Sequence, residues 1–230
     1  MPEGRALLEL CEAARGLSPA RTALLLLTAL DPSLDPAEAM ALDLGARDAR
    51  LLEARARCFG DGFEAAADCP ACGTRLDVAL SARALRQPEP PHLPPETANG
   101  PDDLAFRLPT SEDLLAVEAE RGPAAMKRAL LERCLLHGEA SPAAEALVSA
   151  GLEAAMPQSD VSVALACPDC GHDWELPFDV TLFLLDELEG RAGRLLADVH
   201  LLASAYHWEE ATILDMPASR RGRYVSMVSA

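Results

Sequence analysis

The chain has 230 residues, of which 50% are apolar and only 4% aromatic, and its 20 basic and 37 acidic residues give a formal net charge of −17. This apolar content excludes disorder throughout and suits one ordinary domain or two small ones, with a core built mainly from Leu, Ala and Val. The acidity disfavours a nucleic-acid backbone as the main partner. No apolar run approaches the roughly 18 residues that span a bilayer, and the start of the chain lacks a signal-peptide pattern, so we expect a cytoplasmic protein without a membrane partner.

Residues 1–60 are predicted to form an N-terminal helical region. Ser18 followed by Pro19 is a helix start, and the run 20–30 is apolar almost all round, which is typical of a buried helix. A later segment, 46–59, has helical apolar spacing and ends at Gly60. The arginines of this segment are expected to form a solvated face; they are Arg47, Arg50, Arg55 and Arg57.

Two near-identical pentapeptides, Cys-Pro-Ala-Cys-Gly at 69–73 and Cys-Pro-Asp-Cys-Gly at 167–171, are the most informative feature of the sequence. Alternating apolar residues precede and follow each of them, which predicts strands at about 63–67, 76–80, 161–166 and 174–180. Each pentapeptide is therefore expected to join two antiparallel strands. Together the two hairpins, 61–83 and 160–180, would form a split Cys₄ zinc ribbon.

A helical insertion is predicted at 110–159, between the two hairpins, with helices at 112–120, 123–136 and 142–155. It follows a proline-rich linker with a short strand at 84–109, in which we expect an extended spacer. The C-terminal helical region, 180–230, is expected to hold a long helix at 180–206 and shorter ones at 208–214 and 217–228. The predicted fold class is thus α+β and mostly helical, with the split ribbon flanked by N- and C-terminal helices.

The four paired cysteines, Cys69, Cys72, Cys167 and Cys170, have the spacing of a metal site. Two Cys-x-x-Cys turns supply tetrahedral Cys₄ coordination, which suits one structural Zn²⁺ per chain and leaves no position open for catalysis. A redox role for the cysteines is the alternative, but thioredoxin-type sites use one pair at a helix N-terminus. Closing the 94-residue loop between the pairs costs about 4 kcal/mol, which is less than the 10–16 kcal/mol or so that structural zinc supplies.

Enzyme motifs are missing from the sequence: it has no His-Glu-x-x-His, no phosphate-binding glycine loop and no nucleophile elbow. We therefore expect a protein that is not an enzyme, with no catalytic residues and no small-molecule substrate. Zinc ribbons also bind nucleic acid, but acidic residues surround both cysteine pairs, and their charge repels phosphates. Protein–protein interaction fits the sequence better.

The order of these features resembles a family of contractile phage tails and contractile injection systems, the T-even-phage-like baseplate proteins. The resemblance covers nearly the whole chain except the proline-rich linker and much of 138–160. Its matching segments are 44–52, 58–60, the first cysteine turn with Arg75-Leu76, 106–110 with Asp113-Leu114, the second cysteine turn with Trp174 and Phe178-Asp179, and 194–224.

The resemblance implies a component or assembly factor of the baseplate, whose partners are other baseplate or tail proteins. Such a protein is cytoplasmic during assembly and, as a structural subunit, part of the assembled tail particle. For docking we expect the C-terminal tail, with Trp208, Ile213, Leu214, Arg220, Arg221 and Tyr224. The alternative for the tail is that its apolar residues only pack onto the long helix. The alternative function is a zinc-ribbon transcription-related adaptor or nucleic-acid-binding regulator that uses the tail arginines.

Overall fold

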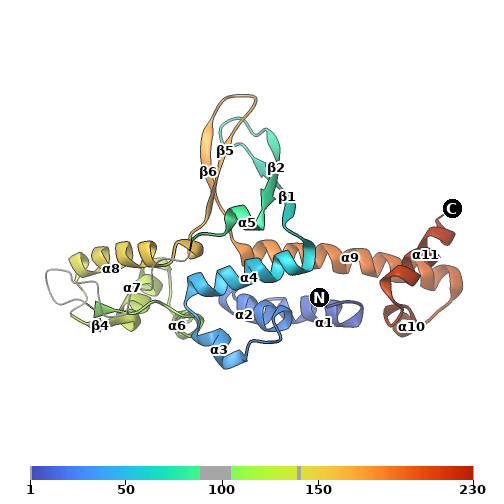
Figure 1. The fold of residues 1–230 in the computed structure, drawn as a ribbon, viewed down its shortest axis with the longest axis horizontal. Coiled ribbons are helices and arrows are strands. Elements are labelled where there is room, and N and C mark those ends of the chain that lie inside the picture. Colours follow the sequence, from blue (N-terminus) through green and yellow to red (C-terminus); the bar gives the residue numbers. More distant parts are fainter. Residues whose placement is uncertain (1, 89–104, 139–140, 230) are drawn as a thin grey trace. The chain divides into compact units, whose positions relative to one another are not determined.

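The computed structural model describes residues 2–88, 105–138 and 141–229, and Figure 1 shows the order of its elements. The chain forms two compact units, Met1–Leu30 with Thr181–Ala230 and Asp31–Val180. Helices predominate in both, and the described strands pair only as three two-stranded antiparallel sheets. The prediction of a mostly helical α+β protein is confirmed. Most of the predicted proline-rich linker lies outside the described residues.

Among its described residues, the unit that joins the two ends of the chain contains helices and no strands. Its helices are α1 (Arg5–Ala14), α2 (Pro19–Leu30), α9 (Val180–Tyr206), α10 (Glu210–Leu214) and α11 (Ala218–Val228). Burial in α9 follows a helical period, with Leu184, Leu188 and Leu202 fully buried. By contrast, none of the residues of α11 is buried.

His207 ends α9 in an unusual conformation for a residue with a side chain. Its φ is 55°, in the left-handed region, and its N–H donates to the carbonyl of Ala203 at 2.9 Å. Glycine normally occupies this position at the end of a helix because it has no Cβ to clash. The turn brings Trp208 against Tyr206, with ring centroids 4.6 Å apart, and Tyr224 of α11 packs edge-on against both rings.

We predict that His207→Gly raises the free energy of unfolding by about 0.5–1 kcal/mol, because the left-handed turn then carries no steric cost. Urea denaturation followed by tryptophan fluorescence measures the change. His200→Gly, on an exposed position inside α9, is the matched control and should cost about 1 kcal/mol. A destabilised His207→Gly variant would contradict the explanation.

The second unit carries the hairpins and the helices around them. The helical elements are α3 (Pro36–Ala41), α4 (Leu44–Phe59), α5 (Ala82–Leu85), α6 (Ser111–Val117), α7 (Pro123–Cys134), α8 (Pro142–Ala155) and the 3₁₀ turn η1 (Pro157–Ser159). Side chains cap several helix starts as the sequence indicates: Asp35 caps α3, Asp43 caps α4 and Thr110 caps α6.

The predicted bounds of one helix and one strand need correction. Helix α7 ends at Cys134 instead of 136, and the following residues form the strand β4 (Leu135–His137), which pairs with β3 (Ala105–Phe106). The strand after the second cysteine turn ends at Pro177 and not at 180. Phe178 adds one further hydrogen bond, from its N–H to the carbonyl of Val161 at 2.8 Å, and Val180 already begins α9.

The arginines of α4 do not form a uniformly solvated face. Arg47 and Arg55 are buried, with 8% and 2% of their surface exposed. The guanidinium of Arg55 donates to the carbonyl of Gly60 at 2.7 Å and lies 4.2 Å from the ring centroid of Phe63. The buried charge of Arg55 is stabilised by the carbonyl at the C-terminal end of the helix and by the face of an aromatic ring.

Gln158 of η1 connects the two ends of the segment between the hairpins. Its side-chain amide accepts from the backbone N–H of Gln87 at 2.8 Å and donates to the carbonyl of Leu85 at 3.3 Å. Because Leu85 ends the helix that follows the first hairpin and Gln158 shortly precedes the second hairpin, this contact closes that segment onto itself.

Asp113 is a buried acid with several hydrogen-bond partners. Its side chain is 2% exposed and accepts from both Nη atoms of Arg107 at 2.5 and 2.7 Å, from Nε of Arg133 at 3.0 Å and from the backbone N–H of Thr110 at 3.0 Å. The hydrogen bonds from Arg107, followed by those from Thr110 and Arg133, hold the pKa of Asp113 well below its usual range despite its burial. The acid therefore joins β3, α6 and α7.

We predict that Asp113→Asn lowers the free energy of unfolding by about 3 kcal/mol at pH 7, because two guanidinium groups lose their counter-charge. Since the pKa is depressed in the folded state, this stabilisation is complete above the ordinary carboxyl pKa of about 4 and is lost as the pH falls towards the folded value. Urea denaturation over a pH series should show the wild type and the variant converging in acid. Glu112→Gln, at the exposed neighbour, should have little effect.

Candidate metal centre

Each cysteine pair occupies the turn of an antiparallel hairpin. The first hairpin is β1 (Gly62–Asp68) with β2 (Arg75–Ser81), and the second is β5 (Ser162–Ala166) with β6 (Asp173–Pro177). The last strand residues before the two turns, Asp68 and Ala166, pair with Arg75 and Asp173. The two turns therefore present their cysteines from equivalent positions.

The same backbone arrangement appears in both turns. The N–H of Cys69 donates to the carbonyl of Thr74, and the N–H of Gly73 donates to the carbonyl of Cys69; Cys167, His172 and Gly171 repeat the pattern. Gly73 and Gly171 have φ of 76° and 71°, a conformation that glycine adopts without strain. The glycine that ends each pentapeptide thus allows the tight turn that points both thiols of a pair the same way.

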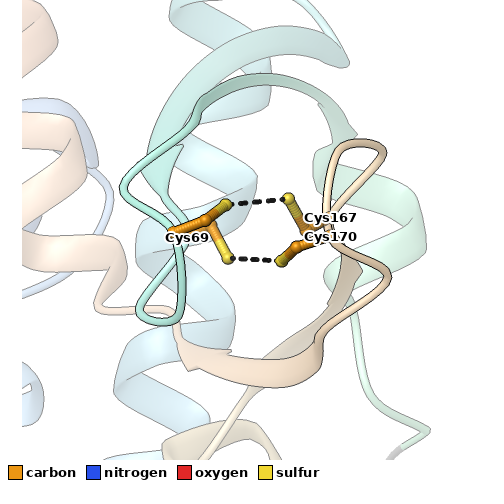
Figure 2. A group of neighbouring side chains, drawn as sticks. Cys69, Cys167 and Cys170 are labelled. Carbon is orange, nitrogen blue, oxygen red and sulfur yellow. Dashed lines mark hydrogen bonds between the residues drawn. The ribbon is translucent and has the colours of Figure 1, made fainter.

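The four paired cysteines form one cluster, as predicted. Their sulfur atoms all lie within 4.8 Å of one another. Across the two hairpins, Sγ of Cys69 is 3.7 Å from Sγ of Cys170, and Sγ of Cys72 is 3.6 Å from Sγ of Cys167. Figure 2 shows the side chains of the two turns pointing toward each other from separate loops. Such a group of thiols can hold a metal ion.

The thiols of the cluster differ in their acidity. The hydroxyl and backbone N–H of Thr74, with further hydrogen bonds among the thiols, lower the pKa of Cys72 to about 6. At Cys170 the backbone N–H of His172 favours the thiolate, but the neighbouring sulfurs outweigh it and raise the pKa to about 12. A metal that requires four thiolates displaces the thiol protons of the cluster, so its affinity rises with pH.

Aromatic contacts join the hairpins at their other end. Phe63 of β1 and Phe178, directly after β6, have ring centroids 5.9 Å apart, and the guanidinium of Arg55 in α4 lies over the Phe63 ring. Phe63 is 8% exposed. The two hairpins are thus held together by apolar packing near α4 and approach each other again at the cysteine turns (Figure 1).

The other cysteines and the histidine next to the second turn lie outside the cluster. Cys11 and Cys134 are buried, and burial raises the pKa of Cys134 to about 11, as expected for an unreactive thiol. Cys58 is half-buried. The exposed ring of His172 stacks on Trp174 with centroids 6.1 Å apart.

The predicted docking residues of the C-terminal tail occupy different environments. Ile213 is fully buried and Leu214 is 6% exposed, which places both in the core instead of on a docking surface. Trp208 and Tyr224 are half-buried in the aromatic group with Tyr206. Arg221 pairs with Asp198, Nε to Oδ2 at 3.1 Å. Arg220 is exposed, as is Arg223, which was not among the predicted docking residues.

Comparisons with protein-family models, curated proteins and solved structures found no match to this chain. Among the described residues, no helix is both long and apolar enough to cross a membrane. The site must therefore be interpreted from its own geometry.

We predict that Cys167→Ser lowers the bound metal below one equivalent per chain and lowers the melting temperature. Cys167 is buried, and the group of metal-ligating side chains found among the described residues has no fifth member to take its place. Elemental analysis and thermal unfolding with and without chelator measure the two effects. Cys58→Ser should keep full metal content, and a wild-type chain without metal would exclude the site.

Proposed function

We propose that Cys69, Cys72, Cys167 and Cys170 bind one Zn²⁺ ion as a structural Cys₄ site. The observation that carries this proposal is the pair of distances between the hairpins, 3.6 and 3.7 Å. Tetrahedral zinc with Zn–S bonds of about 2.3 Å separates its sulfurs by about 3.8 Å. Two Cys-x-x-Cys turns then form a split zinc ribbon in which all four positions belong to the protein, so that none is open for a substrate or an activated water.

Zinc in this position acts as a clamp. It joins two hairpins that are distant in sequence. Cys72 and Cys167 are 95 residues apart, and Cys69 and Cys170 are 101 residues apart. With a closed site and no catalytic motif in the sequence, the proposed role is non-enzymatic and consists of protein–protein interaction. The resemblance described above narrows it to a component or assembly factor of a contractile tail baseplate, acting in the cytoplasm and binding other baseplate or tail proteins.

The charges around the ribbon favour a protein partner over nucleic acid. Its exposed surface carries Asp68, Asp77, Asp169, Asp173 and Glu175, against Arg75. Acidic side chains at this density repel phosphates but suit a basic protein surface. The rival function, a nucleic-acid-binding regulator, would therefore have to use the arginines of the C-terminal tail and not the surface of the ribbon.

For docking in the C-terminal region, the proposed surface is the exposed stripe of α11. Arg220, Arg223 and Met227 follow each other at helical spacing, and Met227 is 67% exposed. The aromatic group of Tyr206, Trp208 and Tyr224 holds the helix beside this stripe, since Tyr224 lies one turn after Arg220. Packing and docking are thus assigned to different residues of the tail.

Co-purification of the tagged full-length chain with co-expressed sheath, tube and baseplate subunits from the same genome tests the assembly role. We expect at least one baseplate subunit to co-purify, and Arg220→Glu with Arg223→Glu to reduce its recovery at least fivefold. Arg5→Glu with Arg194→Glu, on exposed sites of other helices, is the matched control. Salt-sensitive binding to duplex DNA without subunit capture would support the rival function instead.

A further inference from the structure

A hydrogen bond between two side chains links the cysteine turns without involving any thiol. Oγ1 of Thr74, directly after the first turn, donates to Oδ2 of Asp169, inside the second turn, at 2.7 Å. The same Thr74 hydroxyl lies 3.3 Å from Sγ of Cys72. Thr74 therefore contacts a cluster thiol of its own turn and an acid of the other turn at once.

This contact is not a by-product of the repeated turn. The two pentapeptides have nearly the same sequence and the same backbone hydrogen bonds. At the matching positions, however, the first turn has Ala71 where the second has Asp169, and the second has His172 where the first has Thr74. Because Ala71 offers no side-chain acceptor, the equivalent contact in the other direction cannot form, and the link depends on two residues that the repeat does not require.

We propose that Thr74 and Asp169 form a latch that positions the two turns for the metal. The latch rests on the proposed zinc site and deepens it by assigning residues that control metal affinity and release. The hairpins are already held at one end by Phe63 and Phe178. The latch holds their other end, where the four thiols must converge, next to Cys72, one of the two exposed thiols of the cluster.

The physical reason is preorganisation. Without a contact between the turns, the metal must itself overcome the freedom of two hairpin tips before all four thiolates coordinate. A hydrogen bond to a charged carboxylate is stronger than one between neutral groups and fixes the spacing of the tips in advance. Outer-shell partners of metal ligands commonly change metal affinity by about 10–100-fold, and the exposure of Asp169 places this pair at the lower end.

The direct test is Thr74→Val, which keeps the shape and charge of the residue but removes its hydroxyl. We expect its zinc affinity, measured by competition with a chromogenic chelator, to fall about tenfold, and zinc transfer to excess chelator to accelerate by a similar factor. Thr74→Ser restores the hydroxyl and should return both values to within about twofold of the wild type. Co²⁺ spectra of all variants should keep the thiolate charge-transfer bands of a tetrahedral Cys₄ site, which shows that the ligands themselves are unchanged.

A matched pair of acid variants separates the latch from the general effect of negative charge. Asp169→Ala and Asp173→Ala each remove one exposed carboxylate near the second turn, but only the first removes the latch. We expect Asp169→Ala to bind zinc about tenfold more weakly than Asp173→Ala. Because the two latch residues act together, Thr74→Val with Asp169→Ala should be no weaker than Asp169→Ala alone.

The outcomes distinguish the latch from the site it serves. If Thr74→Val binds and releases zinc like the wild type, the latch is wrong and the Cys₄ site stands. If Thr74→Ser is as weak as Thr74→Val, the packing of residue 74 and not its hydroxyl is responsible, which also overturns the latch. A wild-type chain that binds neither zinc nor Co²⁺ overturns the metal site and the latch together.

Discussion

The convergence of four thiols is the constraint on which the arrangement of the two hairpins, distant in sequence, depends. Two-stranded hairpins are at best marginally stable alone, and neither hairpin here buries a complete apolar face. Their pairing across the cluster replaces the core that they lack, with Phe63 and Phe178 supplying apolar contact at one end. In this unit, contacts among a few side chains hold the two hairpins together, as packing between whole sheets does in larger β structures.

Local signals explain why much of the fold was predictable. Proline and capping residues mark helix starts in any tertiary setting, so Ser18-Pro19 located α2, and the predicted helices 142–155 and 180–206 coincide with α8 and α9. The cysteine cluster was predictable for a related reason. Thiols at Cys-x-x-Cys spacing point the same way from one turn, and two matching turns have few other uses than to face each other.

The features that escaped prediction depend on partners distant in sequence. Arg55 looks like a surface residue until the end of its own helix and Phe63 fold around its guanidinium. Asp113 is a capping residue in the sequence, and only the structure adds Arg107 and Arg133 to it. The latch between Thr74 and Asp169 also had a faint signal, since these positions differ between two otherwise repeated turns, but the difference gains meaning only when the turns meet.

The amide clamp of Gln158 changes the size of the ring that a bound metal closes. Cys72 and Cys167 are far apart in sequence, but the hydrogen bonds of Gln158 with Leu85 and Gln87 shorten the path along the chain that joins them. The remaining path runs 13 residues from Cys72 to Leu85 and 9 from Gln158 to Cys167, about 22 in all, which lowers the entropic cost of closure by about 1 kcal/mol relative to the full loop. At the proposed zinc site the ion therefore closes this shorter ring and not the full loop between the two cysteine pairs.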